Sequence, residues 1–241
     1  MSDDSNKKKG IRGERIRQLI AAGSGLGIAS FALLHLGGHL AAPVSVGAAN
    51  EILFAAREAY QHPAVETLLL GSLILHSGAA LSALRVQRMN LFKATGLFLL
   101  ASVPVHVAAT RVIPYSFGTP VDLRFVRTTM DAAAGHPVVA RLFFPYYVAL
   151  GTSGLFHGLV GVAKALRRLT GFKTDAWVYN PTATRRVFGI SLAAMLATVL
   201  AINGYAGDWN GSDWTFVDAA TRVQWADLHH ATYKIFSFGL L

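Results

Sequence analysis

The chain contains no cysteine, and this absence excludes several kinds of chemistry. Disulfide bridges, thiolate-bound iron–sulfur clusters and cysteine nucleophiles all need a thiol, so any redox chemistry here must use other ligands. Charged residues are also scarce: they make up 15% of the 241 residues, whereas 53% are hydrophobic. We find no internal repeat, no low-complexity tract and no Gly-rich phosphate loop that follows a strand. The nine histidines are the side chains left to bind a redox-active metal.

The few charged residues sit in short blocks that separate long apolar segments. Five segments are long enough to cross a hydrocarbon core of about 30 Å at 1.5 Å per residue. The predicted spans are 18–42, 64–85, 91–113, 142–166 and 187–206. The predicted fold is therefore all-α, an integral membrane bundle of five transmembrane helices.

The placement of basic residues predicts the orientation of these spans. Most of the 22 Lys and Arg residues precede the first span or lie in the loops after the second and fourth spans, so these parts are expected in the cytoplasm. A net charge of +9 therefore indicates membrane topology rather than nucleic-acid binding. Residues 1–16 form a basic cytoplasmic segment, 17–206 the membrane domain and 207–241 a non-cytoplasmic tail. The polar, aspartate-containing start does not fit a cleaved signal peptide or a transit peptide.

One histidine lies deep in each of the first four spans: His35, His76, His106 and His157. Any one of them could be a hydrogen-bonded contact between helices, but ionisable groups inside a bilayer are costly, and four are harder to explain in this way. Zinc usually takes four close ligands, and no carboxylate or thiol accompanies these histidines inside the membrane. Haem iron needs only two axial imidazoles, and an apolar helical bundle can supply the rest of its pocket. We therefore expect two bis-histidine haems b.

The depth of each histidine in the membrane predicts how the four ligands pair. His35 and His106 lie in outward spans, roughly 8 to 12 Å from the outer boundary at the rise of an α-helix. His76 and His157 lie in inward spans, about 10 to 14 Å from the cytoplasmic boundary by the same rise. We expect His35 with His106 at an outer haem and His76 with His157 at an inner haem. Pro104, which shortly precedes His106, is expected to loosen the third span locally.

Glycines flank several of the proposed ligands and leave room beside them. A flat porphyrin would use that room, but close packing between membrane helices predicts the same pattern. These glycines are Gly37, Gly38, Gly78, Gly154, Gly158 and Gly161.

From about Arg17 to Tyr205, the sequence resembles the five-helix, dihaem cytochrome b subunit of succinate dehydrogenase and fumarate reductase, the single-chain membrane anchor of several bacteria. The residues that carry the resemblance are FALLHLGGH at His35, LILHSGA at His76, KATG followed by VHVAATRV around His106, the loop FGTPVDL, and GLFHGL at His157. Their order along five spans carries the resemblance more than any single motif does.

The resemblance implies a function for the chain. The four histidines would be haem iron ligands with the pairing given above. The chain would carry a flavoprotein and an iron–sulfur subunit on its cytoplasmic face and pass electrons between that complex and a membrane quinone, expected to be menaquinone. The flavin and dicarboxylate sites would belong to the partners, so no catalytic residue for succinate is expected in this chain. The location would be the bacterial cytoplasmic membrane.

Further residues have weaker assignments. Arg17 and Lys93, where family members carry basic residues near haem propionates, are expected to contact these groups or to act as topology charges at the interface. Arg111 and Arg141 could do the same on the outer side. His39 and Glu66 are weak candidates for quinone contacts, and His39 could also compete with His35 as an iron ligand.

The tail departs from the family pattern, which ends soon after the fifth span. Its tryptophans fit an aromatic belt at the membrane interface, and its histidines fit a surface position. The residues concerned are Trp209, Trp214, Trp225, His229 and His230.

Two other functions stay open at the level of the sequence. The chain could be the cytochrome b anchor of another quinone-linked enzyme, such as a hydrogenase or a formate dehydrogenase. It could also be a haem-free membrane adaptor that uses the same bundle.

Overall fold

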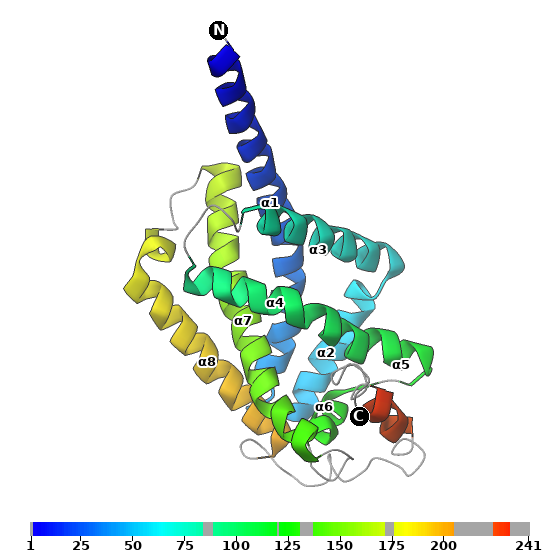
Figure 1. Ribbon diagram of the computed structural model, residues 1–241. Coiled ribbons are helices and arrows are strands. Elements are labelled where there is room, and N and C mark those ends of the chain that lie inside the picture. Colours follow the sequence, from blue (N-terminus) through cyan, green and yellow to red (C-terminus); the bar gives the residue numbers. More distant parts are fainter. Residues whose placement is uncertain are drawn as a thin grey trace.

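The computed structural model describes residues 2–83, 89–119, 121–130, 137–171, 176–204 and 224–231. Within these ranges the regular structure is entirely helical (Figure 1). The elements are α1 (Ser2–Leu40), α2 (Val46–Tyr60), α3 (Pro63–Ala83), α4 (Leu91–Val107), the π-helix η2 (Ala108–Val112), α5 (Ile113–Ser116), α6 (Leu123–Met130), α7 (Pro137–Thr170), the 3₁₀-helix η4 (Ala176–Tyr179) and α8 (Pro181–Asn203). A further helix at 224–231, which we call the tail helix, belongs to the C-terminal segment.

Five stretches of helix are long and apolar enough to cross a membrane, which confirms the predicted all-helical, multi-pass architecture. They are Gly13–Leu40, Pro63–Ser82, Leu91–Ser116, Arg141–Thr170 and Pro181–Asn203. The fifth begins earlier than predicted, because the side chain of Asn180 caps the amides of Thr182 and Ala183 and Pro181 suits a first turn. Arg185 and Arg186 thus lie inside the helix rather than in the preceding loop.

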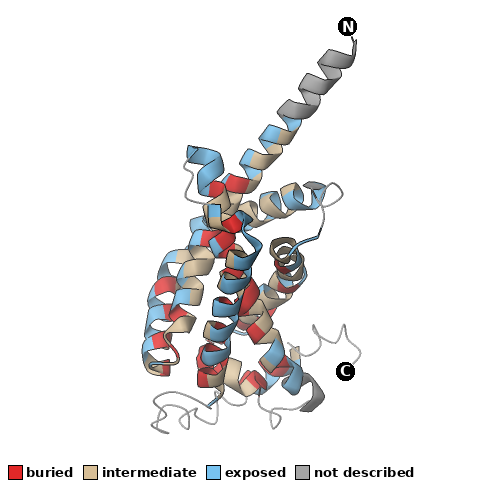
Figure 2. Ribbon diagram, turned by 90° about the vertical axis from the view of Figure 1, so that its left-hand side faces the viewer, coloured by how far each residue is buried: buried red, intermediate tan, exposed pale blue. Residues whose placement is uncertain are grey.

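The two longest helices, α1 and α7, form the centre of the molecule. α3 packs on α1, whereas α4 and α8 pack on α7. In Figure 1, α3 and α4 cross this central pair at a steep angle instead of running alongside it. Figure 2 shows that the buried residues gather where helices meet. Apolar residues of α3 that face outward stay exposed, with Leu68 at 70% and Ile74 at 64%, as a lipid-facing surface would require.

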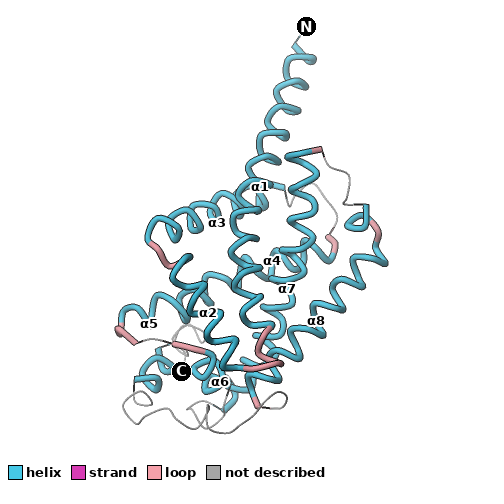
Figure 3. Tube along the Cα trace, turned by 180° about the vertical axis from the view of Figure 1, so that it is seen from behind, coloured by secondary structure: helices cyan, strands magenta, loops and turns pink. Residues whose placement is uncertain are grey.

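Two helices that the sequence analysis did not predict, α2 and α6, lie at the end of the molecule opposite the N-terminus, which we call the distal end (Figure 3). The hydroxyl of Ser45 caps α2 by accepting a hydrogen bond from the amide of Ala48 at 3.2 Å. The apolar face of α2 then packs against α1, where Gly38 provides the room. A Cβ at that glycine would lie 2.7 Å from Leu53 Cδ2, so α2 docks at a point where α1 has no side chain.

The largest core cluster also lies at the distal end. It joins α2, α6, α7 and α8 through Leu53, Leu123, Phe143 and Ile202, each no more than 3% exposed. The short helices between spans are therefore integral parts of the fold.

Replacement of Leu53 by alanine should remove part of this core. We expect a loss of about 2 to 4 kcal/mol in the free energy of unfolding, because the side chain is 2% exposed and the site is held on several sides. Thermal unfolding in detergent, followed by circular dichroism, measures the effect. Val44→Ala is the control, since Val44 is 78% exposed. Equal melting temperatures for the two variants would show that α2 is not packed as described.

Candidate functional site

The histidines of α3 and α7 face each other near the middle of the molecule. The ring centres of His76 and His157 are 6.3 Å apart, with planes inclined by 84°. Nδ1 of His76 lies 3.0 Å from the carbonyl oxygen of Ala21 on α1, and Nδ1 of His157 lies 3.1 Å from that of Phe92 on α4. A carbonyl only accepts hydrogen bonds, so each Nδ1 donates its proton and each Nε2 keeps its lone pair. We call these residues the proximal pair.

Glycines receive both rings of the proximal pair. A Cβ at Gly25 would lie 3.0 Å from Cε1 and Nδ1 of His76, and one at Gly96 would lie 2.7 Å from Cε1 of His157. Each imidazole therefore rests on bare backbone of a crossing helix. Phe92 stacks on His157 at 4.2 Å with an interplanar angle of 4°, which fixes the plane of that ring. The proximal pair is held by backbone and packing on both sides.

A second pair lies nearer the distal end. The ring centres of His35 on α1 and His106 on α4 are 6.4 Å apart, with planes inclined by 66°, and we call them the distal pair. His39, one turn after His35, approaches it with 3.3 Å between the two Nε2 atoms. Phe31 stacks on the ring of His35 and Tyr60 of α2 meets it edge-on. Three imidazoles therefore share the distal region, whereas the proximal region has two.

Nδ1 of His35 is buried and has no hydrogen-bond partner among the residues that the structure describes. A buried polar nitrogen without a partner costs free energy, so this ring is incompletely satisfied in the protein alone.

The separations of the rings fit two imidazoles that share one metal ion. A metal–imidazole bond is about 2.0 to 2.1 Å long, so two rings on opposite sides of an ion have their centres about 6 Å apart. Both pairs have this spacing, and in both pairs the two histidines come from different helices. Within the described part of the chain, no group of three or more His, Asp or Glu side chains is arranged to hold a metal ion by itself. A planar ligand that already provides most of the coordination is the group that a histidine pair suits.

The basic residues considered near the haem propionates lie beside the proximal pair. Arg17 is one turn before Ala21, whose carbonyl accepts the hydrogen bond of His76, and it forms an ion pair with Glu14. Lys93 follows Phe92, whose carbonyl accepts the bond of His157, and its own amide donates to the capping side chain of Asn90 at 3.0 Å.

Glu66, considered as a quinone contact, has a partner that the sequence did not indicate. Its two carboxylate oxygens accept hydrogen bonds from Nε and a terminal nitrogen of Arg111 at 2.6 and 3.0 Å. Both side chains are about one third exposed. The pair ties the start of α3 to the π-helix η2. Arg141, by contrast, is exposed on α7.

The π-helix η2 follows directly after α4 and His106. Pro104 has no amide hydrogen, and the amide of Ile113 reaches back five residues to the carbonyl of Ala108, as a π-helix requires. The wider turn changes the direction of the side chains that it carries, including Thr110 and Arg111. Pro104 was predicted to loosen this span locally. In the structure, a π-helical turn follows α4 in place of further α-helix.

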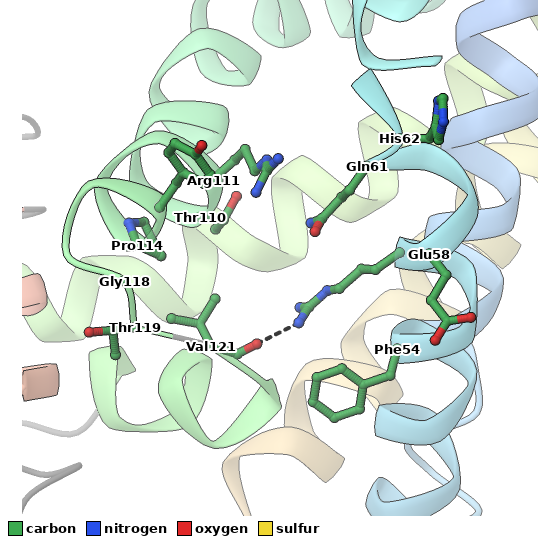
Figure 4. A pocket seen from close by; sticks show the side chains of 12 residues that line it. Phe54, Glu58, Gln61, His62, Thr110, Arg111, Pro114, Gly118, Thr119 and Val121 are labelled. Carbon is green, nitrogen blue, oxygen red and sulfur yellow. Dashed lines mark hydrogen bonds between the residues drawn. The ribbon is translucent and has the colours of Figure 1, made fainter. Parts of the chain in front are cut away.

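A pocket of about 680 Å³ opens at the distal end, beside the distal pair (Figure 4). One wall comes from α2, a second from η2 and α5, and a third from Thr119 and Val121. Arg57 of α2 donates a hydrogen bond of 2.5 Å to the carbonyl of Val121, marked by the dashed line in Figure 4. Thr110, also in the lining, is one turn after His106. Sequence reasoning missed this pocket because it overlooked α2, whose signal was the cap at Ser45.

Predictions for the tail are met in part. Of its aromatic residues, Trp209 and Trp214 lie outside the described residues. Trp225 is 4% exposed and His229 is 3% exposed, so both are buried against α6. The sequence had predicted a tryptophan at the membrane interface and a histidine at the surface, and both predictions are wrong. His230 is exposed, as predicted.

Comparison of the chain with known protein families, curated proteins and solved structures gives no match.

The ion pair between Glu66 and Arg111 should contribute little to stability. Because both side chains are partly exposed, we expect a coupling energy below about 1 kcal/mol in a double-mutant cycle of Glu66→Gln and Arg111→Gln. Chemical denaturation in detergent provides the four free energies. A coupling well above that value would show that the pair is a structural requirement and would leave Glu66 no freedom for a second role.

Proposed function

We propose that this chain is the membrane-anchor cytochrome b of a succinate:quinone oxidoreductase, of the succinate dehydrogenase and fumarate reductase type, and that it binds two haems b. The observation that carries the proposal is the spacing of the two histidine pairs, which join four different spans with ring centres 6.3 and 6.4 Å apart. The resemblance of the sequence around these histidines supports the choice of family.

The orientation of two of the proposed ligands supports iron binding. His76 and His157 each donate Nδ1–H to a backbone carbonyl, which leaves Nε2 for the metal and makes the imidazole a better donor. His35 and His106 would bind the second haem, and His39 would lie next to His35. A haem held by such a histidine pair would supply one-electron transfer.

Basic residues near the proximal pair would meet the carboxylates of the haem. Arg17 and Lys93 lie within a turn of the two carbonyls that orient this pair, so they come to the same region from α1 and α4. A cation at a membrane boundary stabilises a nearby carboxylate. We assign both residues to propionate contacts on the side of the N-terminus.

The distal pocket is our proposed site for the quinone head group. It combines apolar surface from Phe54 and Pro114 with polar groups such as Gln61 and Thr110, as a quinone ring with two carbonyls would require. The pocket adjoins the distal pair, since Thr110 donates its hydroxyl hydrogen to the carbonyl of His106 at 2.8 Å. Glu66, through Arg111, and His39 are the nearest candidates to exchange protons with a quinone.

The orientation follows from charge. The basic N-terminus would lie in the cytoplasm of a bacterium, together with the iron–sulfur and flavoprotein subunits that dock there, and the distal pocket would lie on the opposite side of the membrane. The chain would therefore connect a soluble dehydrogenase with the membrane quinone pool.

Removal of one ligand should remove one haem. We expect His76→Ala or His157→Ala to abolish the proximal haem and keep most of the distal one, and His35→Ala or His106→Ala to do the reverse. Reduced-minus-oxidised spectra with haem quantification, on chain produced with ample iron and porphyrin, measure this. His230→Ala, at an exposed position outside the spans, is the control.

The outcomes separate the alternatives. If His76→Ala and His106→Ala remove the same spectral component, the pairing is wrong. A colourless protein would rule out a cytochrome and favour a haem-free adaptor. If the haems are present but the copurified soluble subunits belong to a hydrogenase or a formate dehydrogenase, the choice of family is wrong.

The glycine beside His157 gives a second test. A side chain at Gly96 would displace the ring, because even a Cβ would come within 2.7 Å of Cε1. We expect Gly96→Val to lower the occupancy of the proximal haem, and Gly96→Ala to change its midpoint potential, both measured by redox titration. Gly71→Ala is the matched control, since nothing lies within 4 Å of its added Cβ. Unchanged titrations for both Gly96 variants would show that His157 is not an iron ligand.

A further inference from the structure

One wall of the distal pocket is held from two sides. On the side of α2, Arg57 donates to the carbonyl of Val121, and the side chain of Asn50 accepts from the amide of Leu123 at 3.1 Å. These bonds connect α2 to the start of α6. Val121 lines the pocket and is 9% exposed, so its own position sets the shape of that wall.

The tail helix covers the other side of the same wall. Trp225 and Leu228 form a buried cluster with Val121 and Phe125, and Leu228 has no exposed surface. His229 stacks on the ring of Phe125 with 4.8 Å between ring centres and 14° between planes. Figure 1 shows the tail helix beside α5 and α6, at the distal end.

The tail helix depends on this contact for its order. An isolated helix of two turns is not stable in water, because helix nucleation is unfavourable and few hydrogen bonds compensate. Among the described residues, its apolar side chains gain stability by packing on Val121 and Phe125. The same contact removes water from the outer face of the pocket wall, so the tail helix and the wall stabilise each other.

We propose that the tail helix is a clamp that holds Thr119 and Val121 in place as a wall of the distal pocket. The clamp is closed while the imidazole of His229 is neutral, and protonation of this ring opens it. The clamp acts on whatever occupies the pocket, so this inference does not require that the chain binds haem or quinone.

The chemistry of His229 explains why proton uptake would release the helix. Its Nε2 lies 3.2 Å from the hydroxyl of Thr128, and its ring is buried against Phe125. Burial lowers the pKa of His229 from 6.5 to about 4. The docked helix therefore prefers the neutral ring, and docking weakens as pH falls from 6.5 towards 4.

Taken together, the charged groups on the helices around His229 do not stabilise its protonated form. α6 carries Arg124 and Arg127, while Asp122 before it already accepts hydrogen bonds from the amide and Nε of Arg124. Other charges on these elements and near the wall are Asp227 and His230 on the tail helix and Arg57 on α2.

The absence of cysteine makes this clamp measurable in the full chain. A single Thr119→Cys substitution places a thiol in the wall, at a residue that is 4% exposed, and Val44→Cys provides a freely exposed reference thiol. Each purified protein in detergent is treated with a maleimide. The labelling rate of the Thr119→Cys protein is then divided by that of the Val44→Cys protein at the same pH. This labelling ratio cancels the pH dependence of the thiol itself.

At pH 7.5 we expect slow labelling of the wall thiol. Trp225→Ala and His229→Arg, each added to the Thr119→Cys chain, should raise the labelling ratio by about fivefold or more, because both open the wall locally. His230→Arg is the matched control with the same added charge at an exposed neighbour, and it should leave the ratio unchanged. In the protein with His229 intact, lowering the pH from 7 to 5 should weaken docking on the order of 20-fold, and the ratio should rise accordingly. His229→Gln should remove most of that rise.

Circular dichroism and elution volume establish that each variant is folded. If folded proteins with Trp225→Ala and His229→Arg label the wall thiol at the original rate, the tail helix does not hold the wall. An equal pH response in His229→Gln would show that another group is the sensor. Failure of the haem and quinone assignments would leave these labelling results unaffected, so the two proposals fail independently.

Discussion

An imidazole inside a membrane-spanning helix must be held through at least one of its ring nitrogens, and much of this structure meets that requirement. Water is absent from the hydrocarbon region, so an unsatisfied nitrogen there is costly. His76 and His157 use Nδ1 to bond backbone carbonyls of neighbouring helices and leave Nε2 free. The protein thus orients both rings of the proximal pair. In the distal pair, the buried Nδ1 of His35 has no hydrogen-bond partner among the described residues.

The same requirement explains why helices approach closely at glycines. A ring can reach a backbone carbonyl on another helix only where no side chain intervenes. Gly25 and Gly96 provide this access for the proximal pair. The steep crossing of α3 and α4 over α1 and α7 brings these contacts together (Figure 1). Glycine positions in this chain therefore determine both the packing of helices and the orientation of the proposed ligands.

The two ends of the molecule are built differently. The N-terminal end carries the long basic extension of α1 and the residues beside the proximal pair. The distal end is closed by short helices, since α2, α6 and the tail helix pack around the pocket and connect through Arg57 and Asn50. Pro104 and the π-helix direct Arg111 towards Glu66 at this same end. In the proposed function, soluble partners would dock at the first end and the quinone would bind at the second.

The sequence by itself determined the five apolar spans, the all-helical class and the four histidines at similar depths in two pairs, because span length and hydropathy are local properties. It also indicated the orientation through its basic residues. Only the tertiary structure decided the docking of α2 and α6, the partner of Glu66, the carbonyl bonds of His76 and His157, and the burial of Trp225 and His229. These features depend on contacts between residues far apart in the chain, such as Arg57 with Val121. No local pattern specifies which backbone group a distant side chain will meet, since that is settled by how the helices cross.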